Sequence, residues 1–81
     1  MTSLSWRTLE SRVPFDELPA LHRRFLVWRG VEGVEEMPLR RVQQRTEAEL
    51  NKMAMAGEIQ KTAEDWLLTA DVWEALGIAL P

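Results

Sequence analysis

The 81-residue sequence predicts one small α+β domain with a three-helix core, a C-terminal β-hairpin and a short last helix. Three observations predict this class. Before Gly57, apolar residues recur at steps of three and four residues, which is the period of an α-helix. After Gly57, two short stretches of strand-like composition are separated by a connection of hairpin length. No internal repeat, low-complexity tract or linker divides the chain, so we expect a single domain.

Apolar packing must supply the stability of this domain. Hydrophobic residues make up 46% of the chain, and the absence of cysteine excludes disulfides and thiolate metal sites. The apolar runs at residues 25–28 and 53–56 are far shorter than the roughly 20 residues of a membrane-spanning helix. The chain begins with methionine and lacks the pattern of a signal peptide. We therefore expect a complete, soluble, cytoplasmic protein that has no membrane partner.

Residues 1–14 predict either an N-terminal arm or a short helix that packs on the main body, residues 15–81. The apolar side chains of this segment, Trp6 and Leu9 among them, are spaced roughly as on one helix face. Pro14 ends the segment, because a proline biases the residue before it away from helical geometry.

The next segment predicts a helix that begins after Asp16 and ends at Gly30. Asp16 is a favourable N-cap, and Pro19 lies in the first turn, where its missing N–H costs nothing. Gly30 ends the helix with a left-handed cap. The single histidine, His22, lies beside the apolar stripe and is expected to be a partly buried or surface side chain. The stripe itself, which we expect to face the core, consists of Leu18, Leu21, Phe25 and Trp28.

A connector at residues 31–37, which could hold one short strand, leads to a short helix opened by Pro38. Leu39 and Val42 are its expected inward pair.

A capping box then predicts a new helix that starts with almost no loop after Arg45. In such a box the Thr46 hydroxyl accepts the N3 amide proton, and Glu49 reaches back to the Thr46 amide. This helix would begin at Glu47 and end at Gly57. Its inward residues would be Leu50, Met53 and Ala54.

Residues 58–62 and 66–69 are the two strand candidates, joined by residues 63–65. Thr69 would then cap a last helix over residues 70–76, which ends at Gly77. We expect Trp66 in the core, together with the inward side of the last helix, Val72, Trp73 and Leu76.

The pattern Leu50-x-x-Met53-x-x-x-Gly57-x-Ile59, followed by Trp66-x-Leu68-Thr69, resembles the winged helix-turn-helix family. The resemblance lies mainly in residues 38–69 and includes the tight junction before the capping box. It implies a small winged-helix-like domain in which the hairpin is the wing. It also implies a non-enzymatic, DNA-associated transcriptional regulator, and we expect such a small module to dimerise.

The resemblance assigns contact residues to this chain. The third helix of the family enters the major groove, while the second helix and the wing touch phosphates. Groove-facing positions would be Ala48, Asn51, Lys52 and Met55. Phosphate contacts would come from Arg40, Arg41, Arg45 and Lys61.

The charge pattern leaves an alternative open. The formal net charge is −3, and Glu47 and Glu49 fall in the first turn of the expected recognition helix, where they would repel phosphate. The fold could instead serve as a protein-protein interaction or adaptor module. Tryptophan, arginine and methionine are enriched at interface centres, so Trp6, Leu9 and Met55 are the candidate interface residues. Trp6 packing on its own domain is the competing interpretation.

The sequence gives little support to an enzyme. One histidine, no cysteine and no tyrosine leave few general acids, bases or nucleophiles, and the common catalytic motifs are absent from the sequence. We therefore expect no catalytic residue, no metal, no cofactor and no small-molecule substrate.

Overall fold

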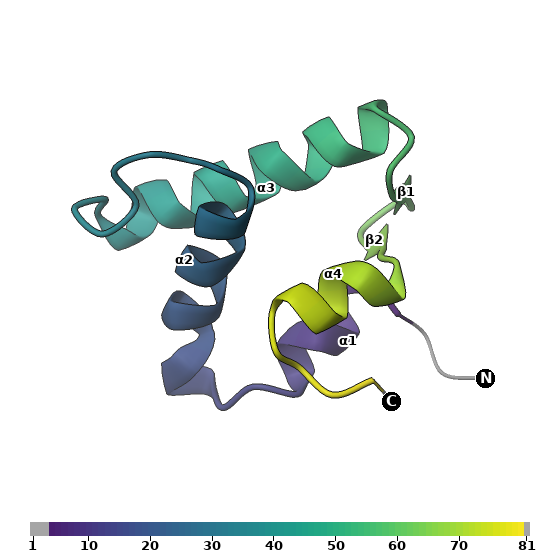
Figure 1. Ribbon diagram of the computed structural model, residues 1–81, viewed down its shortest axis with the longest axis horizontal. Helices are drawn as coiled ribbons and strands as arrows, with labels where there is room; N and C mark the ends of the chain where they lie inside the picture. The colour runs from purple at the N-terminus through teal and green to yellow at the C-terminus, as the bar shows by residue number, and fades with distance from the viewer. Residues whose placement is uncertain (1–3, 81) are drawn as a thin grey trace.

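The structure, a computed structural model, describes residues 4–80 and places three helices before a hairpin and one after it (Figure 1). The hairpin is antiparallel and pairs Gln60 with Leu67 and Lys61 with Trp66. The α+β class, the hairpin and the short last helix are thus confirmed. The elements are α1 (Trp6–Ser11), a 3₁₀ turn (Phe15–Glu17), α2 (Leu18–Trp28), α3 (Leu39–Met55), β1 (Gln60–Lys61), β2 (Trp66–Leu67) and α4 (Ala70–Ala75).

Residues 6–11 form a helix that packs on the main body, which is the second of the two alternatives for the N-terminal segment. Ser5 is its N-cap, and the Ser5 Oγ accepts a hydrogen bond from the Thr8 amide at 3.1 Å. Ser5 also forms an isolated antiparallel bridge with Leu67, and the Leu68 amide donates to the Leu4 carbonyl at 2.9 Å. The N-terminal segment therefore pairs with the edge of β2 before α1 begins.

Helix α2 has the predicted position but a different start and a different inner face. Asp16 lies inside the 3₁₀ turn, and Glu17 occupies the N-cap position, while Pro19 lies in the first turn as expected. Leu26 is fully buried, whereas Trp28 keeps 42% of its surface exposed, so the expectation of a core Trp28 is wrong. Trp28 stands in the last turn of α2, and its ring reaches only the outer edge of the core, 6.0 Å from the Phe25 ring centroid.

The predicted helix ends at Gly30, Gly57 and Gly77 are confirmed, because α2, α3 and α4 end with the same hydrogen-bond pattern. At the end of α3 the Glu58 amide donates to the Met53 carbonyl, and the Gly57 amide donates to the Ala54 carbonyl. This is the Schellman motif, which needs a left-handed residue, and Gly57 supplies it with φ 78°. Gly30 and Gly77 hold the equivalent positions after α2 and α4.

The helix-turn-helix junction predicted at Arg45–Thr46 is wrong, because α3 runs through it as one helix. The Thr46 hydroxyl donates to the Val42 carbonyl one turn earlier, at 2.8 Å, so it is not a cap. Glu49 is buried and turned toward α2. The three helices before the hairpin are therefore α1, α2 and α3. The long α3 replaces the two short helices that the sequence pattern predicted for the same residues.

Turns and bends occupy the connector between α2 and α3 in place of the strand that was considered there. Arg23 of α2 holds this connector by donating from Nη1 to the Val34 carbonyl and from Nη2 to the Met37 carbonyl, the latter at 2.9 Å. Leu39, expected to face inward, is 44% exposed because it stands at the open first turn of α3. Val42, one turn later, is fully buried as predicted.

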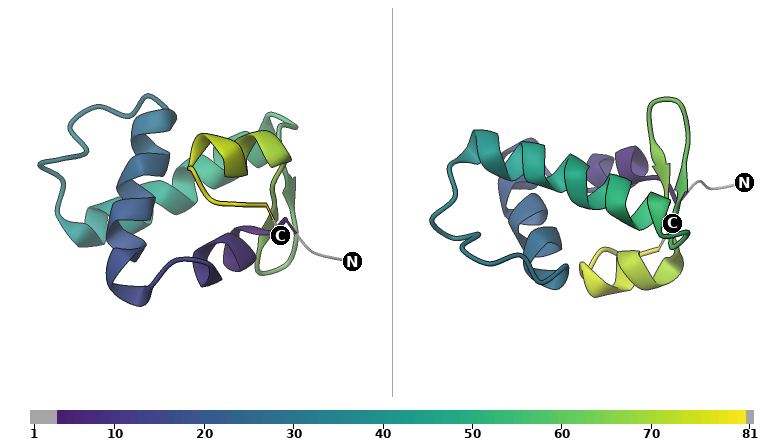
Figure 2. Two further views of the ribbon diagram at one scale, coloured as in Figure 1. Left: turned by 60° about the horizontal axis from the view of Figure 1, so that its bottom comes forward. Right: turned by 90° about the horizontal axis from the view of Figure 1, so that it is seen from above.

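One apolar core joins all four helices and the hairpin. Val72, Trp73 and Leu76 of α4 are buried as predicted, and so are Trp66, Leu50 and Met53. Figure 2 shows α2 and α3 crossing, with α1 and α4 on either side of them and the hairpin at the C-terminal end of α3. Among residues 4–80, no helix is both long and apolar enough to span a bilayer.

Candidate nucleic-acid interface

The continuous α3 places most of the predicted contact residues on one helix. Six of them are exposed there: Arg40, Arg41, Ala48, Asn51, Lys52 and Met55. At 100° per residue, Arg41, Arg45 and Lys52 fall on one side of α3, and we call these three residues the basic flank. Arg40 and Asn51 point to a neighbouring sector, roughly 100° away. A shallow cleft of about 190 Å³ lies along the basic flank between Arg41 and Arg45.

Glu49 lies at the inner border of the basic flank and contacts three cations. Its side chain is only 4% exposed. The Nε of Arg29, the C-cap residue of α2, donates to Glu49 Oε1 at 3.1 Å. Glu49 Oε2 lies 3.5 Å from both Arg45 Nε and Lys52 Nζ. A buried carboxylate is expensive unless it is paired, and here the partly buried Arg29 is its partner.

These positions change the balance of charge on α3. The expectation that Glu47 and Glu49 both face phosphate at a helix start is wrong, because residue 46 is in mid-helix and Glu49 points inward. Within the fully described α3, the first turn carries no acidic residue and holds Arg40 and Arg41 instead. The exposed surface of α3 therefore carries several cations against the single carboxylate of Glu47.

Asn51 and Lys61, two of the predicted DNA contacts, both contact Trp66 of the hairpin. Asn51 Oδ1 accepts a hydrogen bond from Trp66 Nε1 at 3.0 Å. To read an adenine edge with both amide atoms, Asn51 would have to share or release this hydrogen bond. Lys61 Nζ lies 4.5 Å from the centroid of the Trp66 ring, a cation–π distance, and donates to the Thr62 carbonyl. Asn51 therefore links the hairpin to α3, whereas the contacts of Lys61 lie within the hairpin.

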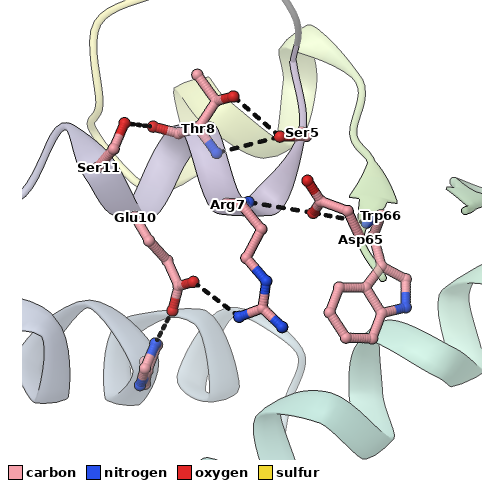
Figure 3. A network of polar contacts seen from close by, with 8 residues as sticks. Ser5, Arg7, Thr8, Glu10, Ser11, Asp65 and Trp66 are labelled. Atoms are coloured by element: carbon pink, nitrogen blue, oxygen red, sulfur yellow. Dashed lines mark hydrogen bonds and ion pairs between the residues drawn. The ribbon is translucent and has the colours of Figure 1, made fainter. Parts of the chain in front are cut away.

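A polar network anchors the other side of the hairpin to α1 (Figure 3). Asp65 Oδ1 accepts hydrogen bonds from the Arg7 amide at 3.2 Å and from the Trp66 amide at 2.7 Å. The Arg7 guanidinium also lies 5.7 Å from the Trp66 ring centroid. The hairpin is therefore held from α1 and from α3, and its orientation relative to α3 is fixed.

Glu10 links α1 to α2 within the same region. Glu10 Oε2 lies 2.7 Å from His22 Nε2, and Glu10 Oε1 lies 3.2 Å from Arg7 Nη1. Burial raises the pKa of Glu10, but the hydrogen bonds and charges of His22 and Arg7 outweigh burial and leave the pKa below its ordinary value. His22 stacks on the Trp6 ring at 5.8 Å, so it packs at the domain's own α1–α2 contact as a partly buried side chain.

The candidate protein-interface residues divide between core and surface. Trp6 is 2% exposed and Leu9 is fully buried, so their assignment to an interface is wrong. Both side chains pack in the core of their own domain, which α1 covers. Met55 is 88% exposed and remains a candidate.

The sequence pattern missed Phe15, which is also 88% exposed. Beside Phe15 lies a small apolar groove of about 170 Å³, lined in part by Leu18, Pro19 and Leu39. Phe15 follows directly after Pro14, outside any periodic segment, so no local signal marked it as exposed.

No group of three or more metal-ligating side chains occurs within residues 4–80. The chain matches no protein-family model, no curated protein and no solved structure in the comparisons made. The arrangement of α3, the hairpin and their charges is therefore the basis for a functional assignment.

Proposed function

We propose that this chain is a non-enzymatic DNA-binding module of the winged-helix type. In this proposal, the exposed surface of α3 faces the major groove and the hairpin lies against the adjacent backbone. The observation that carries the proposal is the orientation of α3. Its exposed surface holds the cations Arg40, Arg41 and Lys52, while the charge of Glu49 is compensated inside the protein.

The shape of this region supports the proposal. Helix α3 has 17 residues and is followed directly by the hairpin, which is fastened to α1 and α3. A single helix fits the major groove of B-DNA, which is about 12 Å wide. Asn51, the residue that could read an adenine edge from the centre of the recognition surface, is engaged with Trp66. We therefore expect a strong phosphate contribution and a weak preference for base sequence.

Binding to mixed-sequence duplex DNA at two salt concentrations tests this function. If the basic flank contacts three phosphates, the logarithmic salt slope is about −2.7, and affinity falls about 40-fold between 50 and 200 mM salt. Changing Arg40 and Arg41 to alanine should weaken binding and reduce the magnitude of the salt slope by about 0.9 for each phosphate contact that is lost. Stability should change by less than about 0.5 kcal/mol, because both side chains are exposed. Absence of binding at low salt would refute the proposal.

The exposed Phe15 favours a second candidate function, self-association of two copies of the chain. Phe15 is followed by Asp16 and Glu17, whereas Leu39 on the other wall of the groove is followed by Arg40. In a two-fold dimer, the acidic side of one groove would face the basic side of the other. Changing Phe15 to serine should lower the sedimentation-equilibrium association constant. If wild-type protein is monomeric at millimolar concentration, this candidate is excluded.

A further inference from the structure

We infer that Glu49 positions the phosphate-binding side chains of the basic flank, so that this buried carboxylate strengthens the binding of an anion. The inference rests on the proposed DNA-binding function and assigns a role to a residue that does not itself touch DNA. It runs against simple charge counting, in which any carboxylate near phosphate weakens binding.

The anchoring of Glu49 is the first step of the argument. Glu49 belongs to α3 and is held from α2 by the 3.1 Å hydrogen bond of Arg29. The Arg29 side chain is itself only 23% exposed. Its Nη1 lies 3.5 Å from Glu58 Oε2. Because the Arg29–Glu49 pair joins two packed helices, the carboxylate has a fixed place and can direct other side chains.

The geometry of Arg45 is the second step. Its Nε atom is enclosed and lies 3.5 Å from Glu49 Oε2, as an ion pair without a hydrogen bond, yet 41% of the side chain is exposed. Because the Nε atom is enclosed, the proposal places the two Nη groups at the tip within the exposed part. Arginine has five N–H donors in a planar fork, so the end that faces away from Glu49 keeps donors for a phosphate.

Lys52 extends the same arrangement by two turns of α3. Its Nζ lies 3.5 Å from Glu49 Oε2 while 65% of the side chain is exposed. An ammonium has three donors, of which Glu49 takes one. Arg45 and Lys52 are thus both drawn toward one carboxylate from opposite directions along α3, and both keep donors that face outward.

The charge sum leaves the site attractive to an anion. Arg29, Arg45 and Lys52 surround Glu49 and Glu58, which leaves one positive charge, and Arg41 of the basic flank adds a second. Glu49 raises the affinity for DNA because it orders these cationic side chains before DNA binds. Ordering a long cationic side chain on binding costs about 0.5–1.5 kcal/mol, which corresponds to roughly twofold to twelvefold in affinity per side chain.

Two variants with the same change of charge give opposite expectations. Glu49→Gln removes the buried carboxylate and should weaken binding to mixed-sequence duplex DNA about threefold to tenfold. Glu58→Gln removes a carboxylate from the same cluster at a side chain that is 53% exposed. It should strengthen binding about twofold, because a repulsive charge is lost while Arg29, which loses its ion pair with Glu58, keeps its hydrogen bond to Glu49. If Glu49→Gln strengthens binding as Glu58→Gln does, the inference is overturned.

A second set of variants tests the positioning role of Glu49 if the Glu49→Gln variant does not fold. Arg45→Ala and Lys52→Ala should each cost more affinity than Arg40→Ala, since Arg40 points to a different sector and has no contact with Glu49 in the described structure. Equal losses for all three variants would contradict a positioning role for Glu49. Failure of wild-type protein to bind DNA is a separate result, which refutes the proposed function itself.

Discussion

Trp6 provides the sharpest contrast between a core residue and an interface residue. It is 2% exposed, its ring lies 5.0 Å from the Phe25 ring at an angle of 58°, and it stacks on His22. Its truncation removes burial and two ring contacts together. Replacing a buried tryptophan or phenylalanine by alanine typically costs about 3–5 kcal/mol. We expect Trp6→Ala to fall in that range.

The size of the chain makes this loss decisive. At roughly 0.05–0.15 kcal/mol per residue, an 81-residue domain has a free energy of unfolding of about 4–12 kcal/mol. Trp6→Ala should therefore remove between about a quarter and all of the stability. Urea denaturation followed by far-ultraviolet circular dichroism measures this loss without relying on tryptophan fluorescence.

Phe15→Ala is the matched control, because Phe15 is an aromatic residue of the same N-terminal region that is 88% exposed. It should change the free energy of unfolding by less than about 0.5 kcal/mol. The reasoning fails if Trp6→Ala costs less than about 1 kcal/mol, well below the range for a buried aromatic residue. It also fails if Trp6→Ala alters self-association while stability stays unchanged.

Three further predictions test the helices and the α1–α2 contact. Glu47→Pro should cost at least about 3 kcal/mol, because residue 47 lies inside α3, whereas a helix that began at Glu47 would tolerate proline in its first position; Glu47→Ala in the same denaturation assay is the control. Gly57→Ala should cost about 1–2 kcal/mol in thermal melts from backbone strain alone, since φ is 78° and the added Cβ meets nothing within 4 Å in the described structure. Glu10 has a lowered pKa in the folded state, so its stabilising contribution is complete above the unfolded pKa of about 4.3 and is lost as pH falls through the folded pKa. Glu10→Gln should flatten the acid limb of the stability–pH curve, and an unchanged limb would contradict this assignment.

The features predicted correctly from the sequence are those that depend on neighbouring residues only. Gly57 ends α3 because a Schellman cap involves only the last turn of its own helix. Val72 and Trp73 face inward because their helix has one apolar side and follows a hairpin of fixed length. Such features are visible in a few consecutive residues.

The features that failed depend on distant parts of the chain. Thr46 and Glu49 have the spacing of a capping box, but the same spacing places both on the inner side of a long helix. Glu49 finds its partner in Arg29, which is 20 positions earlier in the sequence. Likewise, the tertiary packing of α1 decides that Trp6 is buried while Phe15, nine positions later, is exposed. Local patterns carry no information about either outcome.

The central claim, that the outer surface of α3 contacts DNA, is tested most directly by amide chemical-shift changes during titration with mixed-sequence duplex DNA. We expect the shifts to concentrate at Arg41, Ala48 and Lys52 of α3 and at Lys61 of the hairpin, and to disappear at high salt. Absence of shifts at low salt, or shifts centred on the groove beside Phe15, would contradict the account.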